Sequence, residues 1–304
     1  MKKKILITGA NGLLGQKLVY ALKNREDLVV IATARGENRL ANTQGYEFVS
    51  MNIEKQKEVE DTLMKYSPDT IIHCAAMTNV DVCEQKKEEC WAANVTAVQN
   101  ICEAAEKVKA HLIHVSTDFI FDGKNGPYKE DAQPNPVSYY GESKLAAEKI
   151  VEKYKGKWAI LRTVLVYGLV DNMSRSNIVL WAKGGLEKGK TIKVVNDQFR
   201  TPTLAEDLAQ GCVLVMDTKA QGIYNISGKD YMSILELVHK VADYYHLDKS
   251  LIQPISSSSL NQPAMRPPIT GFIINKAIKD LNYQPHSFEE GIKILEEQLK
   301  NFKL

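Results

Sequence analysis

The sequence contains few cysteines, and none of the five stands in a C-x-x-C pair. An odd number of cysteines at irregular spacing is typical of reduced thiols and argues against a disulfide framework. The sequence also has no cluster of His, Cys and carboxylate residues at the spacing of a structural zinc site, so we expect no metal.

Long hydrophobic runs and a strong charge of one sign are missing too. No run approaches the roughly 18 apolar residues of a membrane helix. The apolar residues 5–7 follow three lysines but break at once into Thr8-Gly9, which excludes the core of a signal peptide. The net charge of +2 gives no reason to expect nucleic acid. We therefore expect a cytoplasmic protein that binds neither a membrane nor nucleic acid.

The first half of the chain alternates short apolar runs with longer amphipathic stretches. This alternation predicts right-handed βαβ units and a parallel sheet covered on both faces. The predicted strands are residues 4–8, 28–33, 46–49, 70–74, 112–116 and 158–166, and the predicted helices are 12–24, 54–65 and 88–109.

Beyond Tyr167 helical patterns dominate, at residues 178–188, 204–216, 233–245 and 287–299. A chain of 304 residues is long enough for two moderate cores. We predict an α/β protein with a doubly wound parallel sheet over residues 1–166, to which segments around 192–226 return. A smaller, mainly helical substrate-binding domain would occupy residues 167–304.

The segment GANGLLG places three glycines between the first predicted strand and the first predicted helix. Glycines there allow a tight turn and let the backbone approach a pyrophosphate at the helix N-terminus. The motif in this position predicts a Rossmann dinucleotide-binding domain. We expect the cofactor to contact Gly9, Asn11, Gly12, Leu13, Leu14 and Gly15.

The choice of cofactor depends on the end of the second strand. Arg35 stands twenty residues after Gly15, where a guanidinium can bind the 2′-phosphate of NADP in bidentate fashion. Glu37 lies close by and could instead accept the ribose 2′-hydroxyl of NAD. We favour NADP(H), and Glu37 leaves NAD(H) open.

A second motif predicts proton-transfer chemistry. Tyr140 and Lys144 are four residues apart and share one face of a helix, whereas Tyr139 points elsewhere. Thr117 ends a predicted strand, and ligands of open parallel sheets bind beyond the carboxyl ends of strands. A lysine ammonium near a tyrosine lowers the tyrosine pKa. Tyr140 would then give its proton to a carbonyl oxygen next to Thr117 while hydride reaches the carbon.

These motifs resemble the extended short-chain dehydrogenase/reductase family, most closely its dTDP-4-dehydrorhamnose reductase branch. The resemblance implies a Rossmann fold, NADPH or NADH as cofactor, and reduction of the 4-keto group of a nucleotide deoxysugar. It runs along nearly the whole chain, through GANGLLG from Gly9, CAAMTNVDVCE from Cys74, STDFIFDG from Ser116, YGESK from Tyr140, LRTVLVYG from Leu161 and VVNDQFRTPT from Val194.

The resemblance also implies roles for single residues. The catalytic triad of the family falls on Thr117, Tyr140 and Lys144, of which Tyr140 and Lys144 would also contact the cofactor. Further cofactor-lining positions are Asn52, Ile53, Cys74, Ala75, Ala76, Thr78, Asn94 and Ser116. Substrate-binding positions are Val80, Asp81, Asp118, Phe119, Asn177, Arg200 and Arg266, although Asp118 could equally orient Thr117 or cap the backbone.

Two departures from the branch pattern keep other functions open. Arg200 stands where the branch usually has glycine, and RPPITGF replaces an Arg-Pro followed by serine and leucine. Arg200 and Arg266 are similar to the arginines that hold the diphosphate in nucleotide-sugar epimerases and dehydratases. An epimerase with tightly bound NAD is therefore the alternative, while a dehydratase would need an Asp-Glu pair that Thr117-Asp118-Phe119 does not supply.

The fold also resembles the regulatory subunit of methionine adenosyltransferase, which binds a dinucleotide as a partner protein. The intact triad argues against a purely regulatory role. The expected partner is a small nucleotide sugar, and related enzymes suggest a homodimer. His73 and His114 alternate with apolar residues, so we expect buried histidines with satisfied ring nitrogens rather than catalysts.

Overall fold

The protein is described by a computed structural model that covers residues 2–172 and 176–301. Its centre is a seven-stranded sheet in the order β11-β6-β5-β4-β1-β2-β3, and every neighbouring pair is parallel. The chain winds outward from β1 in both directions, so the doubly wound α/β fold is confirmed. The strands are β1 (Lys3–Thr8), β2 (Leu28–Ala34), β3 (Glu47–Ser50), β4 (Thr70–His73), β5 (His111–Thr117), β6 (Trp158–Thr163) and β11 (Gly222–Asn225).

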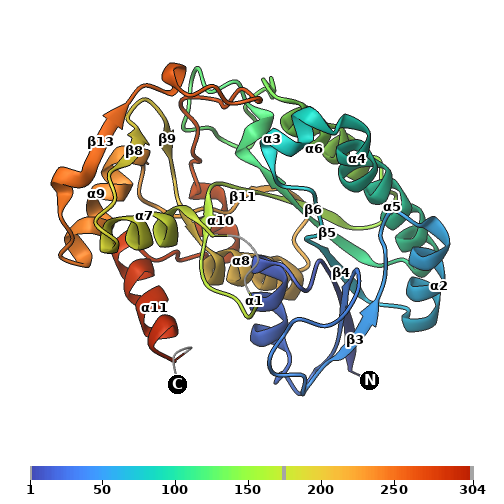
Figure 1. Ribbon diagram of the computed structural model, residues 1–304. Coiled ribbons are helices and arrows are strands. Elements are labelled where there is room, and N and C mark those ends of the chain that lie inside the picture. Colours follow the sequence, from blue (N-terminus) through green and yellow to red (C-terminus); the bar gives the residue numbers. More distant parts are fainter. Residues whose placement is uncertain (1, 173–175, 302–304) are drawn as a thin grey trace.

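Helices cover both faces of this sheet (Figure 1). Successive residues of β1 point to opposite faces, so Ile5 and Ile7 join one core cluster and Leu6 joins another. The first core is closed by α1 (Leu13–Leu22), α8 (Ala205–Thr218) and α10 (Asn275–Leu281). The second is closed by α2 (Gln56–Tyr66), α5 (Ala97–Val108) and α6 (Tyr139–Val151).

Two predicted elements are interrupted in the structure. The strand expected over 158–166 divides into β6 and β7 (Val166–Tyr167), because Leu165 takes a positive φ of 39° that extended backbone cannot contain. The helix expected over 88–109 divides into α4 (Lys87–Trp91), a π-helical turn (Ala92–Thr96) and α5. Such turns are rare and occur frequently at functional sites.

The C-terminal part has its own apolar core, which includes Val179, Leu237, Val241 and Ile292. Its helices are α7 (Ile178–Glu187), α9 (Ile234–Tyr244) and α11 (Phe288–Asn301), and its short strand pairs are β8 (Ile192–Val195) with β13 (Ile252–Ile255), β9 (Phe199–Arg200) with β12 (Met232–Ser233), and β10 (Thr203–Leu204) with β7.

The segments expected to return to the large sheet around 192–226 divide between the two parts. Strand β11 joins the sheet and α8 packs against α1, whereas β8 pairs with β13 outside it. The predicted domain boundary therefore remains a prediction. Within residues 2–172 and 176–301, no helix combines the length and the apolar character needed to cross a bilayer.

Candidate functional site

The glycine loop between β1 and α1 is packed so closely that larger residues cannot fit. Gly9 has a φ of 68°, and a Cβ there would lie 2.8 Å from the Ala75 nitrogen. A Cβ on Gly15 would lie 2.2 Å from the Gly9 carbonyl oxygen. Helix α1 begins with Leu13 and Leu14. Among the described residues, no side chain caps this helix and no acidic residue lies in its first turn. This unneutralised helix N-terminus suits a pyrophosphate.

Asn11 ties the glycine loop to the loop after β2. Its Nδ2 donates to the carbonyl oxygen of Glu37 at 2.8 Å, and its Oδ1 accepts from the amide of Arg39 at 2.9 Å. The Arg35 side chain is 78% exposed, and only a long 3.9 Å ion pair joins it to Glu54. Its guanidinium is therefore free to turn toward a ligand at the end of β2.

Replacement of Arg35 tests the cofactor prediction. We expect Arg35→Ser to weaken NADPH binding roughly 10-fold, since a charge-assisted hydrogen bond contributes about 1.5–3 kcal/mol. NADH has no 2′-phosphate, so its affinity should be unchanged. Titration of the nicotinamide fluorescence with both nucleotides measures the two dissociation constants. Equal losses for NADPH and NADH would contradict the prediction.

The ends of β1 and β4 lie side by side at the point where the chain reverses its winding. Thr8 pairs with His73 in the sheet, and its Oγ1 accepts from the amides of Cys74 and Ala75 at 3.2 Å each. This anchors the start of the predicted cofactor segment, which continues through Ala76 to Thr78. Such a switch point is where open α/β sheets bind their ligands.

Asn94, in the π-helical turn, fixes the same segment from the other side. Its Oδ1 accepts from the Met77 amide at 2.8 Å, and its Nδ2 donates to the Met77 carbonyl oxygen at 3.0 Å. Toward the predicted adenine side, the Ile53 carbonyl oxygen accepts from Asn100 at 3.0 Å, and the Asn52 Oδ1 accepts from the Glu54 amide at 3.1 Å. The predicted cofactor positions at 52–53 and 74–78 thus lie on segments fixed by hydrogen bonds between side chains and the backbone.

The structure brings the three predicted catalytic residues together at the carboxyl end of β5. Tyr140 and Lys144 share a buried face of α6, which begins with Ser138 as its cap. The Tyr140 and Thr117 hydroxyls lie close enough to interact, and each residue is 7% exposed. Lys144 Nζ donates to the Val115 carbonyl oxygen at 2.8 Å.

Burial decides the ionisation of this group. It raises the pKa of Tyr140, although the interaction with the Thr117 hydroxyl opposes the shift. Burial also lowers the pKa of Lys144 to about 8. The pKa of Tyr140 is thus raised and not lowered as we expected, because the loss of hydration is the largest contribution.

The two histidines are buried, as predicted, but they lie beside the lysine. Their rings stack at 5.4 Å, and the Nε2 of His114 is 3.2 Å from Lys144 Nζ. Burial and the Lys144 charge hold both pKa values below the usual range, to about 3 for His73, so both rings are neutral. Within the described residues, one nitrogen of each ring has no hydrogen-bond partner, which differs from the satisfied histidines that we expected.

The seven predicted substrate positions divide into three kinds of contact. Val80, in α3 (Val80–Gln85), and Phe119 pack with Tyr140 in one apolar cluster. Asp81 forms a bidentate ion pair with Arg266, with contacts of 3.1 and 2.7 Å. This pair links α3 to the C-terminal part of the chain.

Arg200 and Asn177 use their polar groups within the protein. Arg200 is 4% exposed, and its guanidinium donates to the carbonyl oxygens of Pro267, Pro268 and Phe199 at 2.7–3.0 Å. Asn177 caps α7 by accepting from two amides, and its Nδ2 donates to a backbone carbonyl oxygen. The structure therefore does not bring these two side chains to the triad as free donors, whereas Asp118 lies directly beside Thr117.

Two residues of the site escaped the sequence analysis. Ser143 is buried, accepts from Asn94 at 3.0 Å and donates to the Tyr140 carbonyl oxygen at 2.7 Å. Its place inside YGESK was the available signal. Thr270 bonds Asp118 across 152 residues of sequence, so no local pattern could have found it.

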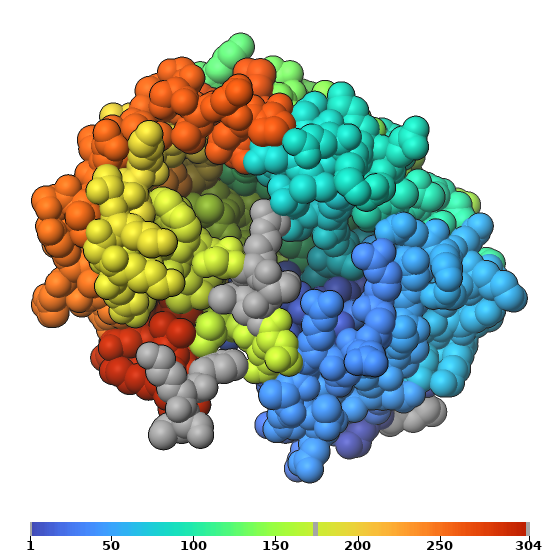
Figure 2. Space-filling model, viewed as in Figure 1, coloured from blue at the N-terminus to red at the C-terminus, as the bar shows by residue number. Residues whose placement is uncertain are grey.

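The site lies where the two parts of the chain face each other. Figure 2 shows the surface hollowed between the blue-to-cyan N-terminal part and the yellow-to-orange C-terminal part. Near the end of β5, the Ser116 hydroxyl is buried and has no partner among the described residues. Over the same ranges, no group of three or more His, Cys, Asp or Glu side chains could hold a metal ion.

The fold and these segments define an α/β protein of the extended short-chain dehydrogenase/reductase type. The chain belongs to the family described as RmlD substrate binding domain, whose model matches residues 2–301. Over 260 residues it is 32% identical to methionine adenosyltransferase 2 subunit beta of Xenopus laevis, covering 84% of this chain and 75% of that protein.

Two further comparisons involve reductases. A probable low-salt glycan biosynthesis reductase of Haloferax volcanii is 28% identical over 298 residues, with 97% of this chain and 98% of that protein covered. The crystal structure of dTDP-4-dehydrorhamnose reductase from Bacillus anthracis in complex with NADP is 29% identical, with a TM-score of 0.84 and coverage of 98% and 100%. The predicted resemblance to this reductase branch is confirmed.

Proposed function

We propose that the chain is an NADP(H)-dependent reductase of a 4-keto nucleotide deoxysugar. The observation that carries the proposal is that Thr117, Tyr140 and Lys144 lie buried together at the carboxyl end of β5. The likeness to a dTDP-4-dehydrorhamnose reductase that binds NADP supports both the cofactor and the substrate class.

The residues around the glycine loop fit a bound dinucleotide. Gly9 and Gly15 let the loop backbone pack more closely than any residue with a Cβ could, and the buried Ser116 hydroxyl, without a partner among the described residues, offers a polar contact. When bound, the reduced nicotinamide supplies a hydride to the carbonyl carbon. The chain would hold it through the glycine loop, Arg35 and the segment anchored by Asn94.

Tyr140 would act as the proton donor of the reduction. Its raised pKa keeps the phenol protonated at neutral pH. The carbonyl oxygen becomes an alkoxide as the carbon is reduced, and an alkoxide is far more basic than a phenolate, so the proton moves from Tyr140 to the substrate oxygen. The charged Lys144 would then stabilise the phenolate that remains.

This account gives a pH dependence. Lys144 is charged below its pKa of about 8 and neutral above it. Since the charged form is the one that stabilises the Tyr140 phenolate, we expect kcat/KM to fall as pH rises through about 8. Arginine stays charged over this pH range. The kcat/KM of Lys144→Arg should therefore not fall near pH 8, whatever the absolute rate of the variant. A profile that is flat from pH 7 to 9.5 in the wild-type protein would contradict the assignment.

Transfer of labelled hydride tests the proposed reaction. NADPH deuterated at the transferred position of the nicotinamide, incubated with the protein and a dTDP-4-keto-6-deoxysugar, should place deuterium on the carbinol carbon of the product. Mass spectrometry and NMR locate the label. Product without the label, or no product at all with a competent reference reductase as control, would overturn the proposal.

An epimerase with retained NAD remains an alternative to the reductase. Its sequence support came from Arg200, Arg266 and Glu37, and the first two now have partners within the chain. An epimerase would release NAD on denaturation and consume no NADPH. The labelling experiment separates it from the reductase, because an epimerase consumes no NADPH and so transfers no deuterium from it to the product.

A regulatory subunit is a further candidate function. The 32% identity to methionine adenosyltransferase 2 subunit beta favours it. Such a protein would bind dinucleotide and a heterologous catalytic subunit without turning over a keto sugar. Size-exclusion chromatography with the methionine adenosyltransferase of the same cell tests this directly.

A further inference from the structure

A segment of the C-terminal part reaches across the site and is held from two sides. We define residues 267–270 as the strap. The amide of Phe199 donates to the Pro268 carbonyl oxygen at 2.8 Å, and the amide of Thr270 donates to the Phe199 carbonyl oxygen at 3.1 Å. On the other side, a Cβ on Gly123 would lie 2.7 Å from the Pro268 nitrogen. The strap is therefore wedged between β9 and the loop that follows the catalytic strand.

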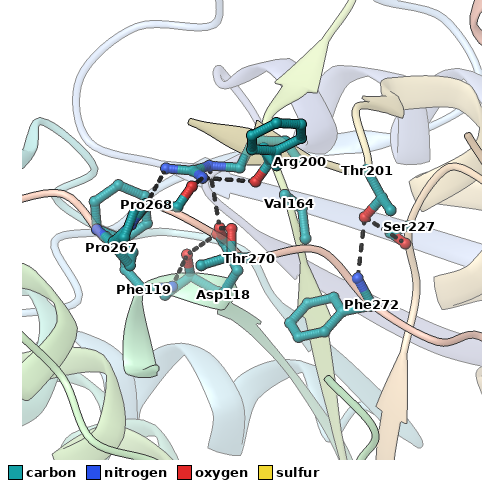
Figure 3. Close-up of polar contacts among 12 residues, drawn as sticks. Asp118, Phe119, Val164, Arg200, Thr201, Ser227, Pro267, Pro268, Thr270 and Phe272 are labelled. Atoms are coloured by element: carbon teal, nitrogen blue, oxygen red, sulfur yellow. Dashed lines mark hydrogen bonds and ion pairs between the residues drawn. The ribbon is translucent and has the colours of Figure 1, made fainter. Parts of the chain in front are cut away.

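Arg200 reinforces this position. Its Nη1 and Nη2 donate to the strap carbonyl oxygens of Pro268 and Pro267 at 3.0 and 2.8 Å, and its Nε lies 3.6 Å from Asp118 Oδ2 (Figure 3). A guanidinium has five N–H donors. Arg200 makes three hydrogen bonds, to the carbonyl oxygens of Pro267, Pro268 and Phe199, and one ion pair, to Asp118, so it holds the strap and the Asp118 carboxylate together.

The Asp118 carboxylate connects the strap to the catalytic threonine. The Thr270 hydroxyl donates to Oδ2 at 2.5 Å, and the Thr117 hydroxyl donates to Oδ1 at 3.1 Å. Asp118 is 2% exposed. A buried carboxylate with few alternative partners is strongly oriented by its donors, and it orients them in turn.

We infer that Thr270 and Arg200 are positioning residues that act through Asp118 to hold the Thr117 hydroxyl beside Tyr140. The inference rests on the proposed reductase function and extends it, because it couples the C-terminal strap to the catalytic threonine. With Oδ2 occupied from the strap side, Oδ1 is left to accept from the Thr117 hydroxyl, and this hydrogen bond fixes where that hydroxyl lies. Arg200 then serves the strap and not a substrate diphosphate.

The test uses two buried threonines that neighbour each other. Thr270→Val removes the hydroxyl from Asp118 and keeps the side-chain shape. Thr201→Val removes a comparable buried hydroxyl, which donates to Ser227 at 3.1 Å and accepts from the Phe272 amide at 3.2 Å but does not contact Asp118 (Figure 3). We expect Thr270→Val to lower kcat roughly 10-fold with unchanged NADPH affinity. Thr201→Val should leave kcat unchanged, and Thr270→Ser should restore it.

The pH profile provides a readout that a purely structural role would not move. Burial raises the pKa of Asp118, while Arg200 and the Thr270 and Thr117 hydroxyls lower it. Tyr140, the remaining titratable group that faces Asp118, is neutral throughout the acid range. Loss of the Thr270 hydroxyl should therefore raise the Asp118 pKa further and shift the acid limb of kcat/KM to higher pH. Thr201→Val should not shift it.

The Asp118 pKa can also be measured without turnover, by 13C NMR of the labelled carboxyl carbon. An upward shift in Thr270→Val alone supports the coupling even where the wild-type protein fails to reduce a keto sugar, and that failure would count against the proposed function only. An unmoved Asp118 pKa would overturn the inference. So would a wild-type-like kcat in Thr270→Val, or equal losses of kcat in both valine variants.

Discussion

Tyr140→Phe should abolish turnover while the protein keeps its fold and its affinity for the dinucleotide. The substitution removes only the hydroxyl, so the ring still packs edge-on against Phe119 at 5.6 Å. Loss of a positioned proton donor costs about 10²–10⁴-fold in rate. The measurement is kcat for NADPH oxidation, together with NADPH affinity from fluorescence titration and the free energy of unfolding from a urea titration.

Tyr139→Phe is the matched control. Tyr139 precedes Tyr140 in the same helix, but its ring packs against Trp91 at 6.2 Å and lies under the Lys87 ammonium. Among the described residues its hydroxyl forms no hydrogen bond with Thr117, so the kcat of this variant should be that of the wild-type protein. Turnover that survives Tyr140→Phe, or that falls equally in both variants, would remove Tyr140 from the mechanism.

Gly15→Ala should destroy dinucleotide binding. The added Cβ would lie 2.2 Å from the Gly9 carbonyl oxygen and 2.7 Å from the Ala10 Cα, and neither backbone atom can turn away as a flexible side chain would. The loop must shift as a whole. A displacement of about 1 Å in a binding site can cost roughly 10²-fold, and forced overpacking costs about 1–3 kcal/mol of stability. Isothermal titration with NADPH and a urea titration measure the two effects.

Gly184→Ala serves as the control for this substitution. Gly184 lies inside α7, where an added Cβ meets no atom within 4 Å among the described residues. Alanine stabilises a helix interior by about 0.5–1 kcal/mol relative to glycine. This variant should therefore unfold at a slightly higher urea concentration, and its NADPH affinity should be that of the wild-type protein. If Gly15→Ala also bound NADPH normally, the glycine loop would not be the phosphate-binding element.

The parallel sheet was predictable because its signal is local and repeated. Buried strands such as Leu28–Ala34 are largely apolar runs bounded by polar segments, and the helices between them are amphipathic. The interruptions were not predictable by the same means. The positive φ of Leu165 ends β6, and nothing in the hydrophobic pattern from Trp158 onward marks that residue.

In the site, too, contacts between residues close in sequence could be predicted, and contacts between distant residues could not. Tyr140 and Lys144 are four residues apart on one helix, so their shared face follows from sequence alone. Arg200 also stands out in the sequence. However, its guanidinium is buried against backbone carbonyl oxygens that lie 67 and 68 residues away along the chain. The contact of Thr270 with Asp118 arises only once the two parts of the chain meet.

The shift in the Tyr140 pKa illustrates a further limit. Spacing identifies which groups are neighbours, but it gives no measure of hydration. Tyr140 and Lys144 are both buried, and burial disfavours the charged form of each. The direction of the tyrosine shift therefore required the folded structure, and it favours a proton donor over a preformed phenolate.

The most direct test of the account is steady-state reduction of a keto sugar. Purified protein would be mixed with NADPH and dTDP-4-keto-6-deoxy-L-lyxo-hexulose, generated in place, and the absorbance of NADPH followed with and without Tyr140→Phe. The account predicts steady NADPH oxidation that depends on the sugar and is lost in the variant. No oxidation by the wild-type protein, together with release of NAD on denaturation, would contradict it and favour an epimerase.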